Sequence, residues 1–141
     1  MGPNLKSEIF ASGEWLESLL TGKLQEVGAD GTVGSDVRDV AYAHLQAIKV
    51  CAAANRRFII TSTSPSWAEC ARPIIKKYAP LGWPVTQKFA AEDPNWKPTV
   101  LSNFASREIL GIEYRDWCQT MLDMADAMVA LGTIQKPAAP Q

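Results

Sequence analysis

The sequence predicts an α/β fold with few strands, in which helices flank an incomplete parallel sheet. Apolar residues recur at steps of three and four in several segments, which is the spacing of a half-buried helix. Residues 57–62 form a short apolar run with β-branched side chains, typical of a strand buried on both faces of a parallel sheet. The 141 residues suffice for one domain. Because the strands are few, we expect part of the sheet to need a cover from elsewhere.

The first expected helix covers residues 7–21. Gly2 and Pro3 precede it and read as a turn. Ser7 is the predicted N-cap, and Gly22 is a helix stop. One apolar stripe joins the helix to a core; it comprises Ile9, Gly13, Leu16 and Leu20.

A glycine-rich segment, residues 28–34, follows a predicted short strand at residues 24–27. Its glycines have the spacing G-x-x-G-x-x-G, which in a reductase indicates phosphate binding at a helix N-terminus. A dinucleotide loop places its last glycine against the first helical turn, whereas the next predicted helix begins five residues past Gly34. We interpret the segment as a turn between a strand and a helix, with nucleotide binding as the alternative.

The next helix is the centre of the prediction. Asp39 stands where an N-cap is expected, and the helix runs to about Val50. One stripe at helical spacing comprises Val37, Ala41, His44, Ile48 and Cys51. We expect this stripe to be buried. His44 on that face is interpreted as a packed, hydrogen-bonded residue, with a general base as the alternative.

The middle of the chain adds a third helix and an edge strand. Ser66 and Glu69 form a capping box that predicts a helix after the strand of residues 57–62. Pro73 lies inside this helix, so we expect a kink or a delayed start. Residues 83–89 read as an edge strand, and the proline-bearing loop after them lies at the surface.

Two capped helices end the chain. Asn103 caps a short helix over residues 104–110, which Gly111 closes. Asp116 caps a last helix, whose stripe contains Met121, Met124 and Met128. We expect this stripe to pack in the core, with an adaptable binding groove as the alternative. Residues 135–141 form a Pro/Ala tail that we expect to be disordered.

Composition narrows the function classes. The net charge is −1 and no cluster of cations occurs, which argues against nucleic acid as a partner. The three cysteines form no C-x-x-C pair and His44 is the only histidine, so neither a disulfide framework nor a metal site is expected. Cys70 and Cys118 read as buried thiols. Trp83 and Trp96, beside prolines, are a hypothetical partner surface.

No apolar run is long enough to form a transmembrane segment, and the N-terminus has no signal-peptide core. We therefore expect a cytoplasmic protein. The alternative is an organelle such as the mitochondrion, within a protein complex.

Four segments carry a resemblance to a known family. These are Gly2-Pro3, the V-R-D-V-A-x-A-H segment from Val37 to His44, the residue 58–62 strand followed by Ser66-Trp67-Ala68-Glu69, and residues 103–112. In this order they resemble the C-terminal portion of the extended short-chain dehydrogenases/reductases (NAD-dependent epimerase/dehydratases). The dihydroflavonol reductase and cinnamoyl-CoA reductase branch is the most similar.

The resemblance implies a partial Rossmann-type fold. Residues 1–134 would be the C-terminal substrate lobe of a two-lobed NAD(P)-dependent oxidoreductase. In that family the glycine-rich cofactor loop and a Tyr-x-x-x-Lys pair lie upstream of the Gly-Pro. Here Tyr42, Tyr78 and Tyr114 are not followed by lysine at the fourth position, so no catalytic residue is carried over.

The same resemblance assigns two groups of site residues. Gly2 and Pro3 match the segment that approaches the nicotinamide of NADP or NAD. The residues that match the wall of the substrate pocket are Asn4, Leu5, Ile9 and Phe10. No metal-binding residue is implied.

Two functions therefore stay open. In the first, the chain is the substrate-binding portion of a carbonyl reductase or epimerase-like protein. It then acts on a small carbonyl substrate only when a longer chain or a separate polypeptide supplies the cofactor lobe. In the second, it is a catalytically inactive relative that serves as a structural or interaction subunit of a larger assembly and binds no cofactor alone. The open sheet edge calls for a protein partner in either case. An autonomous enzyme would need the loop of residues 28–34 to bind the nucleotide.

Overall fold

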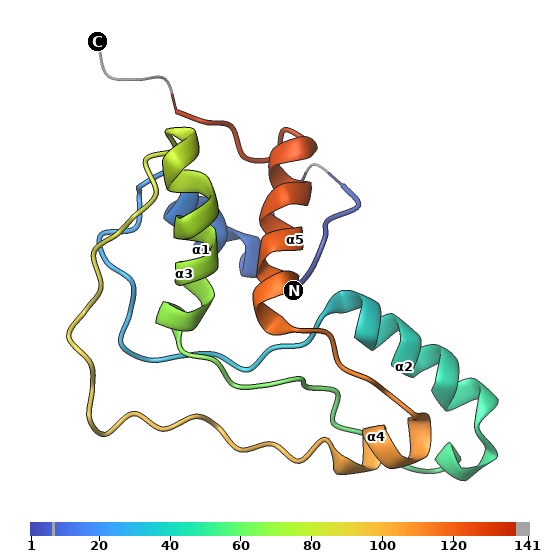
Figure 1. The fold of residues 1–141 in the computed structure, drawn as a ribbon. Coiled ribbons are helices and arrows are strands. Elements are labelled where there is room, and N and C mark those ends of the chain that lie inside the picture. Colours follow the sequence, from blue (N-terminus) through green and yellow to red (C-terminus); the bar gives the residue numbers. More distant parts are fainter. Residues whose placement is uncertain (7, 138–141) are drawn as a thin grey trace.

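The computed structural model describes residues 1–6 and 8–137. In these ranges the chain folds into five α-helices joined by long extended segments (Figure 1). The helices are α1 (Ala11–Leu20), α2 (Val37–Lys49), α3 (Trp67–Tyr78), α4 (Phe104–Leu110) and α5 (Trp117–Ala130). Two short 3₁₀ turns follow α2 and α3, η1 (Cys51–Ala53) and η2 (Ala79–Leu81).

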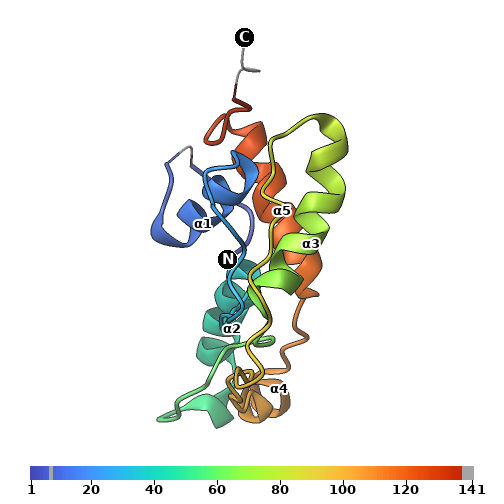
Figure 2. The ribbon, with the colours of Figure 1, turned by 90° about the vertical axis from the view of Figure 1, so that its left-hand side faces the viewer.

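Helices α1, α3 and α5 enclose the larger of two apolar cores (Figures 1 and 2). The predicted methionine stripe of α5 lies in it, since Met121, Met124 and Met128 are fully buried. Leu16 and Leu20 of α1 are fully buried as well. Core packing, rather than a binding groove, is therefore the role of these methionines.

A smaller core lies at the other end of the molecule, where α2, η1 and α4 meet (Figure 1). Its buried members are Ala43, Ala53, Leu110 and Ile112. These members are few and two of them are alanines, so this end buries far less apolar surface than the α1–α3–α5 core. The elements here are held largely by polar contacts at the start of α2.

The predicted strands do not form within the described residues. Of residues 24–27, 57–62 and 83–89, only Val27 and Phe89 form a bridge, which is isolated and parallel. The other two bridges among the described residues are antiparallel and also isolated, Gly31 with Ser66 and Gly34 with Thr63. A strand needs a neighbour along its whole length to satisfy its backbone. The sequence identified the extended segments, and the neighbouring strands that would make them a sheet are absent.

The apolar run of residues 57–62 is also more exposed than predicted. Ile59 is 47% exposed, and Phe58 and Ile60 are half-buried. A run with this composition is expected between two covered faces. Here only one side of it is covered.

Helix α2 begins three residues earlier than predicted. Asp36 is the N-cap, and its Oδ1 accepts a hydrogen bond from the Arg38 backbone N–H at 2.8 Å. Asp39 lies inside the first turn and is buried, where it accepts hydrogen bonds from the backbone and guanidinium of Arg115. An aspartate is a suitable N-cap at either residue, and Asp39 is engaged by Arg115 instead of capping α2.

The predicted buried face of α2 faces outward instead. Val37 is 48% exposed and Ile48 85%, while Asp39 and Ala43 hold the buried side. His44 is exposed, and its Nδ1 lies 2.7 Å from the Val40 carbonyl oxygen. The prediction that His44 is packed was wrong, although its hydrogen bond is present.

The other helix ends follow the predicted capping largely as expected. The Ser66–Glu69 capping box and the Asp116 cap are both present. Asn103 precedes α4, but its amide donates to the Thr61 carbonyl at 2.7 Å instead of capping. Pro73 lies within α3 without delaying its start at Trp67.

Three further expectations concern α1, one cysteine and the tail. Helix α1 starts at Ala11, four residues later than predicted, and the predicted cap Ser7 lies outside the described residues. Cys70 is buried and accepts a hydrogen bond from Trp117 Nε1 at 3.2 Å, and burial raises the pKa of its thiol to about 11. Cys118 is exposed, contrary to prediction. Most of the predicted tail, residues 138–141, also lies outside the described range.

A substitution at Gly34 tests the contact between the glycine-rich segment and α5. A Cβ atom at this position would lie 1.8 Å from the Trp117 ring. We expect Gly34→Ala to lower the free energy of unfolding by about 3 kcal/mol, because neither the ring nor the backbone can yield without disturbing the core. Urea denaturation measures this difference. Gly13→Ala in α1 is the control, since its Cβ would meet the flexible end of Met128 at 3.0 Å and Ile9 Cγ2 at 3.8 Å, and alanine favours the helix. Equal effects of the two variants on the free energy of unfolding would contradict the close contact between Gly34 and Trp117.

Candidate functional site

The six residues assigned to the site lie around one cleft. This N-terminal cleft has a volume of about 430 Å³ and is open to solvent. Its lining consists of residues 1–6 and 8–10, together with Val37 at the start of α2. The structure therefore brings Gly2, Pro3, Asn4, Leu5, Ile9 and Phe10 together. Their roles toward cofactor and substrate stay predictions.

The start of α2 holds the cleft in place. The Val37 N–H donates to the Met1 carbonyl at 2.7 Å. Gly2 follows with a φ of +126°, and a Cβ there would lie 3.0 Å from Val37 Cγ1 and 3.2 Å from Asp36 Oδ1. Glycine is needed at this close approach, where L side chains are both strained and obstructed. The Gly-Pro turn is thus seated directly on the helix cap.

Asn4 is the unusual residue of the cleft. Both polar atoms of its side-chain amide are buried, and neither has a hydrogen-bond partner among the residues that the structure describes. A buried polar group without a partner costs about 1–3 kcal/mol. The Asn4 amide thus has a donor and an acceptor that no described residue satisfies, in a residue that lines the cleft.

The outer wall of the cleft is apolar and exposed. Phe10 is 43% exposed, Ile9 38% and Leu5 95%. Apolar walls around a few polar groups are typical of small-molecule sites. The exposure of Leu5 means that this wall is open on one side and that a further body could close the cleft over a ligand.

A buried carboxylate lies beneath the cleft. Asp36 is 1% exposed; it accepts hydrogen bonds from Arg38 Nε at 2.9 Å and from Thr120 Oγ1 at 2.8 Å. Burial alone would raise the pKa of Asp36, but the hydrogen bonds from Arg38 and Thr120 and the Arg38 charge outweigh it and lower the pKa to about 2. Asp36 is therefore ionised at neutral pH and is neutralised by Arg38, which also pairs with Asp123 at 2.7 Å.

The glycine-rich segment has a packing explanation. A Cβ at Gly31 would lie 2.3 Å from the Pro65 carbonyl oxygen, and one at Gly34 would enter the Trp117 ring. The helix starts closer to Gly34 than predicted, but its N-terminus holds the Asp36 carboxylate, which would repel a phosphate. The geometry favours the interpretation as a turn over nucleotide binding.

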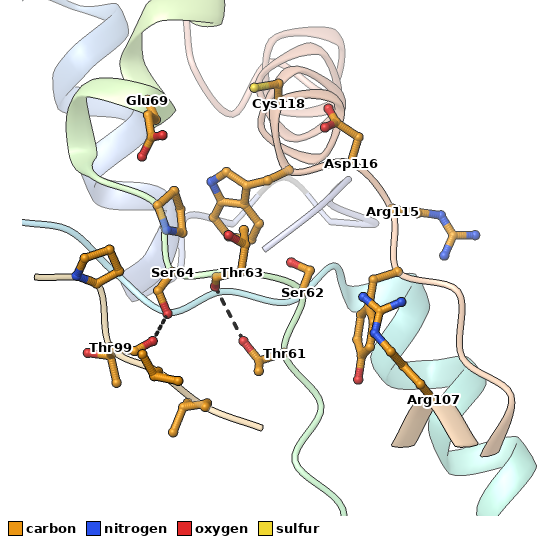
Figure 3. A pocket seen from close by; sticks show the side chains of 16 residues that line it. Thr61, Ser62, Thr63, Ser64, Glu69, Thr99, Arg107, Arg115, Asp116 and Cys118 are labelled. Atoms are coloured by element: carbon orange, nitrogen blue, oxygen red, sulfur yellow. Dashed lines mark hydrogen bonds between the residues drawn. The ribbon is translucent and has the colours of Figure 1, made fainter. Parts of the chain in front are cut away.

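A second cavity, of about 640 Å³, was missed by the sequence analysis (Figure 3). We call it the hydroxyl pocket. Its lining includes Thr61, Ser62, Thr63, Ser64 and Thr99, with Arg107, Tyr114 and Arg115. The run Thr-Ser-Thr-Ser at residues 61–64 was the available signal, and its meaning depended on long-range contacts that a local pattern does not carry.

Most polar groups of the hydroxyl pocket are already used by the fold. Ser62 Oγ donates to the Gly34 carbonyl at 3.2 Å, and Ser64 Oγ donates to the Thr99 carbonyl. Figure 3 shows the Ser64–Thr99 bond joining two extended segments across the pocket. Arg115 is bound to Asp39, and Arg107 stacks over the Tyr114 ring at 4.8 Å. This pocket fastens segments together, and we assign no chemistry to it.

The hydroxyl group of Tyr78 is bound to a carboxylate of α5. The Tyr78 hydroxyl donates to Asp126 Oδ1 at 2.7 Å. Burial, followed by the hydrogen bond and charge of Asp126, raises the pKa of Tyr78. A tyrosine that activates a carbonyl needs a lowered pKa. Tyr78 therefore stabilises the contact between α3 and α5.

Comparison with solved structures places the fold among reductases. A reductase engineered to attenuate substrate inhibition in asymmetric catalysis matches at a TM-score of 0.69 and 26% identity, over 91% of this chain and 40% of that one. Gre2 from Candida albicans in complex with NADPH matches at a TM-score of 0.68 and 25% identity, over 92% of this chain and 41% of that one. Yeast methylglyoxal/isovaleraldehyde reductase Gre2 with NADPH matches in fold at a TM-score of 0.63 and 21% identity, over 93% of this chain and 44% of that one.

The chain thus has the fold of part of a short-chain dehydrogenase/reductase-type protein, and it spans about two fifths of the length of the reductases it matches. No protein-family model and no curated protein matches the sequence. Among the described residues no helix has the length and apolar character needed to cross a membrane.

Lowering the pH should remove the stabilisation that the ionised Asp36 gives to the fold. Because the folded pKa of Asp36 lies below its ordinary value of 3.8, the ionised carboxylate stabilises the fold above that value. We expect this contribution, about 2 kcal/mol, to be lost as pH falls from 5 through about 2.

Urea denaturation of the wild type and Asp36→Asn across this pH range measures the effect, and the difference between them should shrink toward low pH. Glu92→Gln removes an exposed loop carboxylate and should follow the wild-type profile. A constant difference between wild type and Asp36→Asn would contradict the lowered pKa.

Proposed function

We propose that this chain is the C-terminal, substrate-binding portion of an NAD(P)-dependent carbonyl reductase or epimerase-like protein. In this proposal Asn4, Leu5, Ile9 and Phe10 contact a small carbonyl substrate, and Gly2-Pro3 approaches the nicotinamide. The chain is not competent alone, since the glycine-rich cofactor loop and the Tyr/Lys pair are supplied by a cofactor lobe. The observation that carries the proposal is the buried, unpartnered amide of Asn4 inside an apolar cleft.

Each part of the cleft has a task under this proposal. The Asn4 amide donates to, or accepts from, the oxygen atoms of the substrate, which fixes its orientation. Phe10 and Ile9 exclude water from the substrate's apolar part. The rigid Gly2-Pro3 turn on the Asp36 cap sets the distance between substrate and cofactor, which positioning chemistry requires. A bound nicotinamide would supply the hydride, and the cofactor lobe would supply the proton.

A second candidate function is a catalytically inactive structural or interaction subunit. The large exposed apolar area favours a protein partner in general, and this role needs no ligand in the cleft. The two functions differ in what Asn4 does. A structural subunit would satisfy the amide with a partner's backbone, whereas a substrate lobe would satisfy it with a small molecule.

Binding of NADPH separates an autonomous enzyme from a dependent lobe. We expect the purified 141-residue chain to bind NADPH with a dissociation constant weaker than about 1 mM, as followed by nicotinamide fluorescence. Tight, saturable binding would overturn the proposal that the cofactor lobe is separate.

Activity requires both lobes. A chimera in which this chain replaces the matched part of Candida albicans Gre2 should oxidise NADPH with a panel of small aldehydes and ketones. In it, Asn4→Leu should raise KM about tenfold, because one hydrogen bond to the substrate is lost. Asn95→Leu makes the same change in an exposed loop and should leave KM unchanged. A chimera that binds NADPH and reduces no carbonyl would favour the structural subunit.

A further inference from the structure

A third cavity lies between the first turns of α3 and the segment of residues 89–98, which runs beside that helix (Figure 1). Its volume is about 510 Å³, which is within the range of small-molecule sites. It shares no lining residue with the N-terminal cleft and meets the hydroxyl pocket only at Glu69 and Pro98. We call it the aromatic pocket, and it is separate from the site of the proposed function.

Two aromatic side chains, Phe89 and Trp96, form walls of this pocket. Phe89 bridges to Val27, and two backbone hydrogen bonds of 2.9 and 2.8 Å join Val27 to the residues on either side of Phe89. Trp96 packs on Gly31 so closely that a Cβ there would lie 2.5 Å from Trp96 Cζ2. Both rings are therefore held in place by contacts within the chain, which lowers the entropic cost of binding a ligand between them.

The charged groups of the aromatic pocket have both signs. Arg72 of α3 contributes the cation, and its Cζ lies 5.8 Å from the centroid of the Phe89 ring. The carboxylates are those of Glu69, Glu92 and Asp93. Glu69 is engaged in the capping box of α3, and Asp93 accepts a backbone N–H of its own turn at 2.8 Å.

Arg72 and Glu92 are left without ion-pair partners. Neither takes part in a salt bridge among the residues that the structure describes, although both line the same cavity. Their side chains come from different walls, since Arg72 belongs to α3 and Glu92 to the segment opposite. A ligand between these walls can meet a positive group on one side and a negative group on the other.

This charge arrangement selects the class of ligand. A simple anion that reaches Arg72 also meets three carboxylates, and a simple organic cation meets the Arg72 guanidinium. A zwitterion satisfies both signs at once. Fixed ring faces favour an aromatic ligand, because aromatic pairs gain free energy beyond the area that they bury.

We propose that the aromatic pocket binds a free α-amino acid with an aromatic side chain. Its α-carboxylate accepts charge-assisted hydrogen bonds from the Arg72 guanidinium, and its α-ammonium pairs with the Glu92 carboxylate. Its ring packs against Phe89 and Trp96. The ligand joins α3 to the segment of residues 89–98 without any covalent step, and the site is independent of the one assigned to a carbonyl substrate.

Titration of the full 141-residue chain with L-phenylalanine tests this site. The indole N–H resonance of Trp96, assigned with Trp96→Phe, is followed by nuclear magnetic resonance. We expect a saturable shift with a dissociation constant of about 1 mM, as is typical of a ligand of this size. Three probes each lack one recognised group and should bind about tenfold more weakly. They are 3-phenylpropanoate without the ammonium, phenethylamine without the carboxylate, and glycine without the ring.

Two charge-removing variants assign the contacts. Arg72→Gln should bind L-phenylalanine about tenfold more weakly and no longer distinguish it from phenethylamine, because the carboxylate has lost its partner. Glu92→Gln should likewise no longer distinguish it from 3-phenylpropanoate. Lys76→Gln on α3 and Glu108→Gln on α4 remove exposed charges outside the pocket and should bind as the wild type does.

The four variants replace exposed side chains, so their circular dichroism should match that of the wild type. Absence of a saturable Trp96 shift at about tenfold the expected dissociation constant would overturn the proposal. Equal affinities for L-phenylalanine and 3-phenylpropanoate, or for L-phenylalanine and phenethylamine, would overturn it as well. So would an affinity that Arg72→Gln and Glu92→Gln leave unchanged.

Discussion

The fold depends on two buried carboxylates in the first turn of α2. Asp36 joins the helix cap to α5 through Thr120 and Arg38, and Asp39 joins the same turn to the segment before α5 through Arg115. Both are almost fully buried, and a buried charge is tolerated only when its partners are in place. The small apolar core at this end could not hold α2 by burial alone. These ion pairs therefore hold the first turn of α2 to α5 and to the segment before α5, and removing one partner would leave an uncompensated charge.

The geometry of the candidate cleft depends on the first turn of α2, which these ion pairs hold in place. The Val37 N–H holds the Met1 carbonyl, and the Gly2 backbone passes so close to Asp36 and Val37 that no Cβ fits. The position of Asn4 is thus set by Gly2, two residues before it, which lies against the cap of α2, rather than by packing of the cleft's own exposed walls. A site whose floor is rigid and whose outer wall is open can be completed by a second body without losing the placement of its polar group.

The sequence identified local features and missed their tertiary use. Capping boxes and stripes, such as Ser66 with Glu69 and the α5 methionines, follow from backbone chemistry within one element, and the structure has them. Asp39 was mistaken for the cap because Asp36 and Asp39 are both plausible from sequence, and only Arg115, 76 residues away, separates their roles. The six site residues lie close together in the sequence, and the structure places all of them in the lining of one cleft. The hydroxyl pocket depends on contacts such as Ser64 with Thr99, which no local pattern reveals.

Two of the failed predictions concern burial. Val37 and Ile48 of α2 were expected to be buried and are exposed, and residues 57–62 were expected to pair in a sheet, yet the N–H groups of residues 58–61 donate to no backbone carbonyl of the described chain. The two features lie on different sides of α2, because Phe58 and Ile60 pack beside Ala43. A periodic pattern shows that a side chain suits a covered position, and it does not say which element supplies the cover.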